Sequence, residues 1–340
     1  MNSEQRVINT LQRKEVDRIP TFEWSFDKKF IESIYPGHSE DDFIDKFSID
    51  AVIVELYYKK EEIKPDVFKH EWGNIIKFSK EFHAISEGCI KTEDDFKKFN
   101  PPQALAPGRF DPFERAKLIH GGKRALIIHL NDVFSIPRNL LGYENLFINI
   151  ATNPNFVKEL VDMSAEFNLA LAKEAARRGA KIVFTGDDYA YDKGLLISPK
   201  SFDEIFYPGF LKVIKGFKEL GLLVIKHTDG YIWPIIDKLI DSGIDCLDPI
   251  EPKAGMSLSE VKKKYGDRIA IKGNVDCSDT LTFGKVDEVI EETKKCIKDA
   301  GEGYGYVLSS SNSIHSGVKP ENYIAMIRTL REFGNYPLKF

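Results

Sequence analysis

Short apolar runs alternate along this chain with longer segments in which apolar residues recur every three or four positions. Continuous apolar runs are typical of strands buried on both faces, and the longer spacing is typical of amphipathic helices. The runs predict strands at 18–24, 50–56, 124–130, 181–186, 222–227, 244–249, 268–273 and 305–310. The spaced pattern predicts helices at 3–14, 41–47, 143–178, 198–220, 231–243, 257–267 and 285–301.

This alternation of strand and helix sets the expected fold. It predicts parallel pairing through crossover helices, and eight strands fit a closed (β/α)8 TIM barrel better than an open sheet. An open doubly wound sheet is the alternative, but no glycine-rich phosphate loop follows the first strand. Residues 59–123, with a predicted hairpin around Trp72, Gly73 and Asn74, interrupt the pattern. We therefore expect one α/β barrel domain over residues 1–340 with an insertion around 59–123.

Composition narrows the class of protein. Hydrophobic residues make up 42% of the chain and charged residues 30%, as in ordinary globular proteins. The net charge of −5 argues against a nucleic acid or an anionic membrane surface as a partner. The polar N-terminus lacks an apolar signal core, and four widely spaced cysteines without a CxxC pair predict reduced thiols. These features predict a cytoplasmic protein with no nucleic-acid or membrane partner.

Polar residues follow the predicted strands. In a parallel barrel the carboxyl ends of the strands, and the loops after them, form the active site. The candidates at these ends are Glu23, Glu55, His129, Asn131, Asp132, Asp187, Asp188, Tyr189, His227, Asp229, Asp248, Glu251, Lys272, Asn274, Asp276, Asn312 and His315. A polar residue at a strand end is also commonly a helix cap or a loop anchor, and His129, within an apolar run, fits a core histidine.

Two short motifs stand out among these candidates. His227 and Asp229 lie two residues apart, where an imidazole and a carboxylate can bind a metal or transfer a proton. Asp187 and Asp188 are adjacent, so a site that holds both carboxylates close together needs a cation, a shared proton or a positive substrate group. The alternative for Asp229 is a cap on the helix predicted after it.

Three stretches, 186–209, 227–276 and 305–330, resemble the uroporphyrinogen decarboxylase superfamily. They look most like its branch of cobalamin-dependent (corrinoid-dependent) methyltransferases and O-demethylase components. The resemblance covers nearly the whole chain, is strongest from about residue 180 onward, and implies a (β/α)8 barrel.

The chain departs from the decarboxylases of this superfamily at two positions. Those enzymes carry an arginine-rich stretch of the form RQAGR after the first strand, which binds the acidic side chains of the porphyrinogen. The similar stretch here, 20–30, reads PTFEWSFDKKF, without arginine and with acidic Glu23, which would repel such a substrate. Glu55 occupies the position similar to the decarboxylases' key aspartate. Decarboxylation of a tetrapyrrole is therefore not expected.

The chain also departs from the methyltransferases that act on thiol coenzymes. Those proteins bind zinc through a His-x-Cys pair and a later cysteine, whereas here the pair reads His227-Thr228-Asp229 and the later position aligns near Asn312. Oxygen ligands thus replace two thiolates, and zinc accepts oxygen ligands. The predicted metal ligands are His227, Asp229 and a further carboxylate, Glu251 or Asp188.

What the resemblance implies is removal of a methyl group from a methoxylated, aromatic donor and its transfer to cob(I)alamin. No Asp-x-His-x-x-Gly cobalamin signature is present, so cobalamin is expected on a separate corrinoid protein that docks at the barrel mouth. The predicted catalytic residues are Asp187, Asp188, His227 and Asp229. The predicted substrate-binding residues are Glu23, Glu55, Asn131, Tyr189, Asn274, Asn312 and His315. The alternatives are transfer from a methylated corrinoid to a thiol or pterin, a decarboxylase-like lyase, and a noncatalytic binding subunit.

Overall fold

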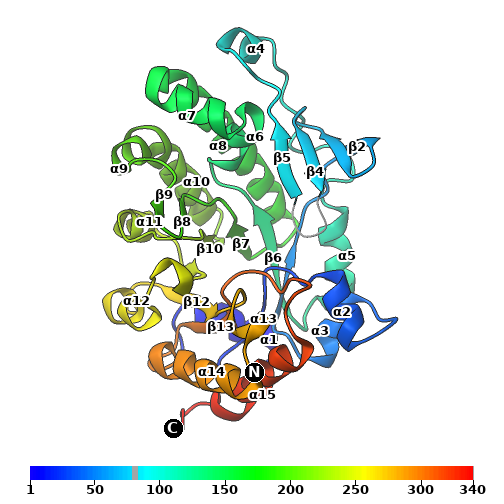
Figure 1. Cartoon of the computed structure of the whole chain (residues 1–340), viewed down its shortest axis with the longest axis vertical. Helices are drawn as coiled ribbons and strands as arrows, with labels where there is room; N and C mark the ends of the chain where they lie inside the picture. The colour runs from blue at the N-terminus through cyan, green and yellow to red at the C-terminus, as the bar shows by residue number, and fades with distance from the viewer. Residues whose placement is uncertain (79–82, 340) are drawn as a thin grey trace.

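A curved sheet of parallel strands lies at the centre of the molecule (Figure 1). The structure is a computed structural model and describes residues 1–78 and 83–339. The strands are ordered β1-β6-β7-β10-β11-β12-β13. Their bounds are β1 Ala51–Val54, β6 Ala125–Leu130, β7 Ile182–Thr185, β10 Leu223–His227, β11 Cys246–Asp248, β12 Ala270–Val275 and β13 Tyr306–Ser310. Because each is parallel to its neighbours, their carboxyl ends meet at one edge.

The first predicted strand, 18–24, is not a regular strand, which corrects that expectation. It forms only isolated bridges, one of them from Thr21 to Leu308 of β13. On one side Leu308 N–H donates to Pro20 O at 3.1 Å, and on the other Asp50 N–H, next to β1, donates to Thr21 O at 2.8 Å. Pro20 has no N–H to donate, which limits the ladder. The segment still lies between the last and first strands, so the predicted α/β barrel is confirmed.

Helices surround this sheet, as Figure 1 shows. Before β6 they are α1 Ser3–Leu11, α2 Lys28–Ile34, α3 Glu40–Lys46, α4 Glu93–Lys97 and α5 Asp111–His120. Between β6 and β10 they are α6 Ser135–Leu141, α7 Tyr143–Thr152, α8 Pro154–Arg177, α9 Pro199–Ser201, a π-helical turn Phe202–Phe206 and α10 Tyr207–Glu219. After β10 they are α11 Ile236–Asp241, a 3-10 turn Pro252–Ala254, α12 Leu258–Tyr265, α13 Thr280–Phe283, α14 Val286–Ala300 and α15 Pro320–Phe333.

Local sequence explains several helix ends. The side chain of Asn2 accepts from Gln5 N–H at 2.8 Å and caps α1. Ser198 caps α9 by accepting from Ser201 N–H at 3.0 Å. The helix predicted at 231–243 is shorter than expected and begins only at Ile236, because Pro234 disfavours helical backbone before it.

Part of the predicted insertion at 59–123 forms its own sheet beside the barrel, coloured blue to cyan in Figure 1. Four antiparallel strands, β2 Lys60–Lys64, β3 Val67–His70, β4 Ile75–Phe78 and β5 His83–Glu87, pair in the order of the chain. The predicted hairpin joins β3 to β4, and Gly73 there adopts φ +86°, which favours glycine. A short hairpin, β8 Ala190–Tyr191 and β9 Gly194–Leu195, follows β7.

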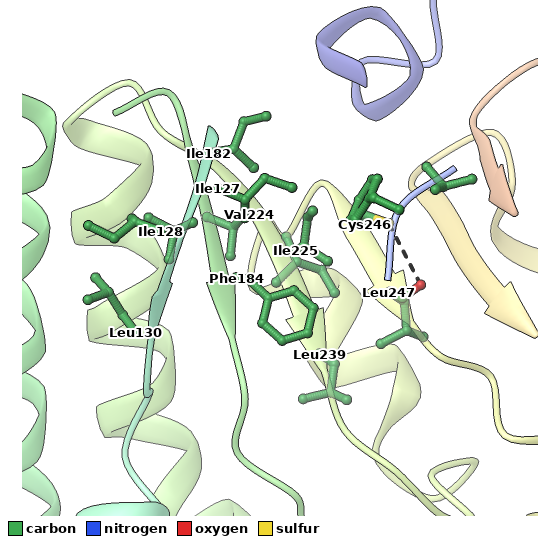
Figure 2. Packing of buried hydrophobic residues seen from close by; sticks show 14 of the residues in the cluster. Ile127, Ile128, Leu130, Ile182, Phe184, Val224, Ile225, Leu239, Cys246 and Leu247 are labelled. Carbon is green, nitrogen blue, oxygen red and sulfur yellow. Dashed lines mark hydrogen bonds between the residues drawn. The ribbon is translucent and has the colours of Figure 1, made fainter. Parts of the chain in front are cut away.

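Hydrophobic side chains fill the interior of the curved sheet and the space between the sheet and its helices. Side chains such as Ile127, Phe184, Ile225 and Leu247 belong to this core, as Figure 2 shows, and all four are almost fully buried. Burial of each such side chain contributes about 1.5–3 kcal/mol. All four cysteines are free thiols, as predicted. In the described part of the chain, no helix is both long enough and apolar enough to cross a membrane.

Candidate functional site

His227, the last residue of β10, is the centre of the site. Its side chain is buried, and its Nδ1 lies 2.6 Å from Oδ2 of Asp248 at the end of β11. The two residues are paired in the register of these strands, so the sheet itself brings them together. Lys272 Nζ donates to Asp248 Oδ1 at 2.6 Å and balances its charge. A histidine held at Nδ1 by a carboxylate has a fixed orientation and presents Nε2 to a ligand.

Two carboxylates face this Nε2. Asp229 Oδ1 lies 3.4 Å and Asp188 Oδ1 lies 3.6 Å from it. Asn312 Nδ2 donates to Asp229 Oδ2 at 2.7 Å, and Asp229 N–H donates to Asp188 Oδ1 at 3.1 Å. Asp229 does not cap the next helix, because α11 begins at Ile236 and has no side-chain cap. The structure thus joins the two motifs that the sequence singled out.

The donor atoms fit a cation. One ligand atom each from Asp188, His227 and Asp229 lies within 4.8 Å of the others, so these three could hold a metal ion. His227 Nε2 and Asp229 Oδ1 are both buried and have no hydrogen-bond partner within the described residues. Buried polar atoms are ordinarily paired, and an imidazole nitrogen with two carboxylate oxygens is a donor set that zinc accepts.

The electrostatics of the cluster agree with a cation site. Burial disfavours a charged imidazole, but the Asp229 and Asp248 carboxylates outweigh it and raise the pKa of His227 to about 10. Burial raises the pKa of Asp188, and the nearby charge of Asp229 adds to the rise. The cluster therefore favours a positive charge, either a proton on the ring or a bound cation.

A second histidine–carboxylate pair lies across the barrel interior. His129 of β6 places Nδ1 2.6 Å from Oε2 of Glu55, which directly follows β1. Trp24 packs against both histidines, with ring centroids 4.4 Å from His227 and 5.5 Å from His129. The ring of Phe184 also packs against both histidines, with its centroid 5.4 Å from that of His227 and 5.7 Å from that of His129. The apolar neighbours of His129 in β6 predicted a core histidine, whereas its pairing with Glu55 depends on the register of β1 and β6.

Two of the predicted residues point away from the cluster. Asp187 Oδ2 accepts from the backbone N–H of Phe134 at 2.7 Å and anchors the loop after β6. Tyr189 is fully buried, and its hydroxyl donates to Asp132 Oδ1 at 2.5 Å. Lys226, which sequence reasoning missed inside its apolar strand, donates to Asp132 Oδ2 at 2.6 Å. This buried set supports the loops of the site.

The remaining predicted residues are distributed around the strand ends. Glu251 is absent from the three-residue metal group found among the described residues and instead accepts from Gly230 N–H at 2.7 Å. Asn274 Nδ2 donates to Ile250 O at 2.7 Å. Glu23 is buried and accepts from the backbone and hydroxyl of Ser310.

The two further candidates are His315 and Asn131. His315 Nε2 lies 3.2 Å from Cys277 O. Asn131 is half-buried directly after β6. Of the predicted substrate-binding residues, Asn312 thus has a direct contact with the cluster.

Comparison with known proteins identifies the family. Residues 84–333 match the model of the uroporphyrinogen decarboxylase (URO-D) family. A methylated-thiol–coenzyme M methyltransferase of Methanosarcina mazei is 23% identical over 243 residues, which are 68% of this chain and 63% of that protein. A methylcobamide:CoM methyltransferase of Methanosarcina barkeri is 28% identical over 176 residues, 52% of this chain and 49% of that protein.

Decarboxylases and a solved structure complete the comparison. A uroporphyrinogen decarboxylase of Pseudoalteromonas translucida is 24% identical over 190 residues, 53% of this chain and 49% of that protein. The chain thus spans between about half and just under two thirds of the length of these curated relatives. The structure of a methyltransferase from Methanosarcina mazei superposes with a TM-score of 0.77 at 19% identity and covers 98% of this chain and 99% of that one. The predicted resemblance to this family is confirmed, and the chain belongs to the uroporphyrinogen decarboxylase (URO-D) family.

Proposed function

We propose that this chain is the methyltransferase of a corrinoid-dependent system. In this proposal it takes a methyl group from a methoxylated aromatic donor and delivers it to cobalt(I) of a cobalamin on a separate corrinoid protein. Two similar proteins whose names describe methyl transfer to coenzyme M support the general class. The aromatic ether as donor rests on the chemistry of the site alone.

The observation that carries the proposal is the Asp188–His227–Asp229 cluster, in which the buried Nε2 of His227 and Oδ1 of Asp229 make no hydrogen bond among the described residues. These three residues would hold a zinc ion, which when bound supplies a Lewis acid for an ether oxygen. Carboxylates are harder ligands than thiolates, and a harder site matches an oxygen substrate better than a thiol. Because a methyl–oxygen bond leaves an alkoxide or phenoxide, stabilising that oxygen is the main task of the site.

The surrounding residues keep this cluster in place. Asp248 fixes the ring of His227, and Lys272 holds Asp248. Asn312 orients Asp229. The half-buried ring of Trp24 packs against His227. Each of these groups acts by binding and orientation, which can supply a large part of the rate enhancement.

A second candidate function is transfer from a methylated corrinoid to a thiol, which the names of the two similar coenzyme M methyltransferases favour. The two candidates use opposite halves of one methyl-transfer cycle. Single-turnover experiments separate them. The protein is mixed with a cobalt(I) corrinoid protein and a panel of methoxylated aromatics, and methylation of cobalt is followed by absorbance, with metal content assayed on the same sample.

We expect methylation by at least one aryl ether and its loss after chelation. If no ether reacts but a thiol demethylates the methylated corrinoid, the thiol transferase replaces our proposal. If neither reaction occurs and no metal copurifies, a noncatalytic subunit replaces both.

The hydrogen bond from His227 to Asp248 gives a sharper test of the metal site. Asp248→Asn leaves all three proposed ligands in place but weakens the group that fixes His227, so we expect metal affinity to fall by about 10- to 100-fold. Affinity is measured by competition with a chelator. The control is Asp241→Asn, which removes an exposed carboxylate paired with Arg268. Equal affinities of wild type and Asp248→Asn would contradict the proposed site.

A further inference from the structure

The two histidines of the barrel interior share an unusual arrangement. Each has Nδ1 at 2.6 Å from a carboxylate, Asp248 for His227 and Glu55 for His129. Each also has a buried Nε2 without a hydrogen-bond partner among the residues that the structure describes. The Nε2 of His227 faces the carboxylates of the Asp188–His227–Asp229 cluster and can bind the cation proposed there. The Nε2 of His129 belongs to no such metal group among the described residues, so it needs another explanation.

The surroundings of His129 fit a group that acts on a ligand. Its side chain is 14% exposed, and that of its partner Glu55 is 60% exposed, so the pair lies at the boundary between interior and solvent. Gly186 lies against the ring, because a Cβ added there would be 2.5 Å from His129 Nε2. The same Cβ would be 3.3 Å from Cη2 of Trp24. Gly186 and the edge of the indole therefore cover this nitrogen.

A movement of the Trp24 side chain would expose His129 Nε2. The backbone of Trp24 belongs to the segment that forms no regular strand, and its indole N–H makes a long hydrogen bond of 3.4 Å to Glu55 Oε1. The ring packs against both histidines, so a donor that displaces it enters between His129 and His227. An imidazole held at Nδ1 by a carboxylate is a recurring arrangement for proton transfer through Nε2.

We propose that His129 donates a proton from Nε2 to the leaving oxygen of the methyl donor and that Glu55 is its positioning residue. This inference rests on the proposed function. In the step, the methyl–oxygen bond breaks and its electron pair stays on oxygen, which takes the proton from His129. Cobalt(I) of the corrinoid substrate supplies the electron pair for the new cobalt–carbon bond. His129 is left neutral, with Nδ1–H still donated to Glu55.

The experiment compares donors that differ in the basicity of the oxygen they release. His129→Gln and Glu55→Gln are assayed in single turnover with a methoxyphenol and with a nitro-substituted aryl methyl ether. We expect His129→Gln to lower the rate with the methoxyphenol by about 100-fold, because general acid catalysis contributes at least that much. With the nitro ether the loss should shrink below about tenfold, because a weakly basic phenoxide leaves without a proton. Glu55→Gln should give a smaller loss with the same trend.

Controls separate a chemical role from a structural one. His38→Gln removes an exposed histidine near Asp42 and should change neither rate. Metal content should match the wild type in every variant. Gly186→Ala should reproduce the effect of His129→Gln, because its methyl group collides with Nε2. Equal losses with both donors, or no loss in His129→Gln, would overturn the inference.

A binding measurement tests the inference even if the wild type transfers no methyl group from any ether, an outcome that contradicts the proposed function alone. Calorimetry then compares binding of the released phenol. We expect about tenfold weaker binding by His129→Gln, because a hydrogen bond to the phenol oxygen is lost. Unchanged affinity would remove His129 from the site.

Discussion

At the scale of single residues, buried charges in this barrel occur in compensated sets. Lys226 is paired with Asp132, and Lys272 with Asp248, and all four side chains are at most 1% exposed. A buried charge without such a partner is costly, so each pair fixes the position of its members. Through Asp248 this constraint extends to His227, which explains why the ring has one orientation.

Glu23 is a buried acid whose titration should be visible in stability. Burial raises its pKa from the ordinary 4.5 to about 7, although Lys272 and the Ser310 hydrogen bonds oppose the rise. Between these two values the unfolded chain releases the proton while the folded chain keeps it, so the free energy of unfolding should fall as pH rises from about 4.5 to 7. The fall should amount to roughly 2–3 kcal/mol.

Urea denaturation at several pH values checks this expectation. Glu23→Gln cannot titrate and should lack this part of the pH dependence. Glu62→Gln, on the exposed strand β2, should retain it. The same slope in wild type and Glu23→Gln would show that Glu23 is charged in the folded protein at neutral pH.

The sequence predicts only part of the site at this scale. His227 with Asp229, and Asp187 with Asp188, were found because they are neighbours in the chain. The Glu55–His129 contact was not found, because it joins residues 74 positions apart through strand register. Asp187 was predicted to act together with Asp188 because the two are adjacent in the chain. Adjacent side chains of an extended segment point in opposite directions, so Asp188 faces His227 while Asp187 binds backbone.

At the scale of elements, strand and helix order was predictable and strand regularity was not. Apolar periodicity located all seven parallel strands. The segment at 18–24 has the same apolar character, but Pro20 limits its hydrogen bonds, and side chains outside the segment hold it. Such long-range support leaves no local pattern in the sequence.

Asp50 provides that support. It is fully buried and accepts from Arg6 Nη1 at 2.8 Å, from both Nη atoms of Arg18 at 2.8 Å, and from Thr21 N–H at 3.0 Å. It therefore joins α1, the irregular segment and β1. Asp50→Asn leaves two guanidinium groups without their shared carboxylate, and we expect the free energy of unfolding to fall by about 3–5 kcal/mol.

Chemical denaturation measures this loss, and Asp17 offers a matched control. Asp17 also pairs with Arg6, but its side chain is 44% exposed. Asp17→Asn should therefore cost about 1 kcal/mol or less. Similar losses for the two variants would mean that burial of the Asp50 cluster does not govern closure of the barrel.

At the scale of the whole molecule, exposed tyrosines lie near the strand ends that carry the site. Tyr191, in the hairpin after β7, is 46% exposed, and Tyr231, after β10, is 38% exposed. Their backbones are joined by a hydrogen bond of 3.0 Å from Tyr231 N–H to Tyr191 O. Tyrosine is enriched where protein partners bind, so the proposed corrinoid protein should contact this pair.

Replacing both tyrosines tests this contact. The Tyr191→Ala and Tyr231→Ala double variant should raise the KM for the corrinoid protein by about tenfold or more, with a much smaller effect on transfer to free cobalamin. Leu118→Ala is the control, since Leu118 is 88% exposed on α5, which packs on β1 and β6. Equal effects on the two acceptors would place the docking surface elsewhere.

Because Trp24 lies between two imidazoles, its fluorescence should report on events in the barrel interior. The chain has only three tryptophans, and Trp24 is the one whose ring lies 4.4 Å from His227 and 5.5 Å from His129. Indole emission depends on neighbouring charge, so loading of the His227 cluster and displacement of the ring by a donor should each alter its fluorescence. With Trp72 and Trp233 replaced by phenylalanine, one emission band would follow both events in real time, without any added label.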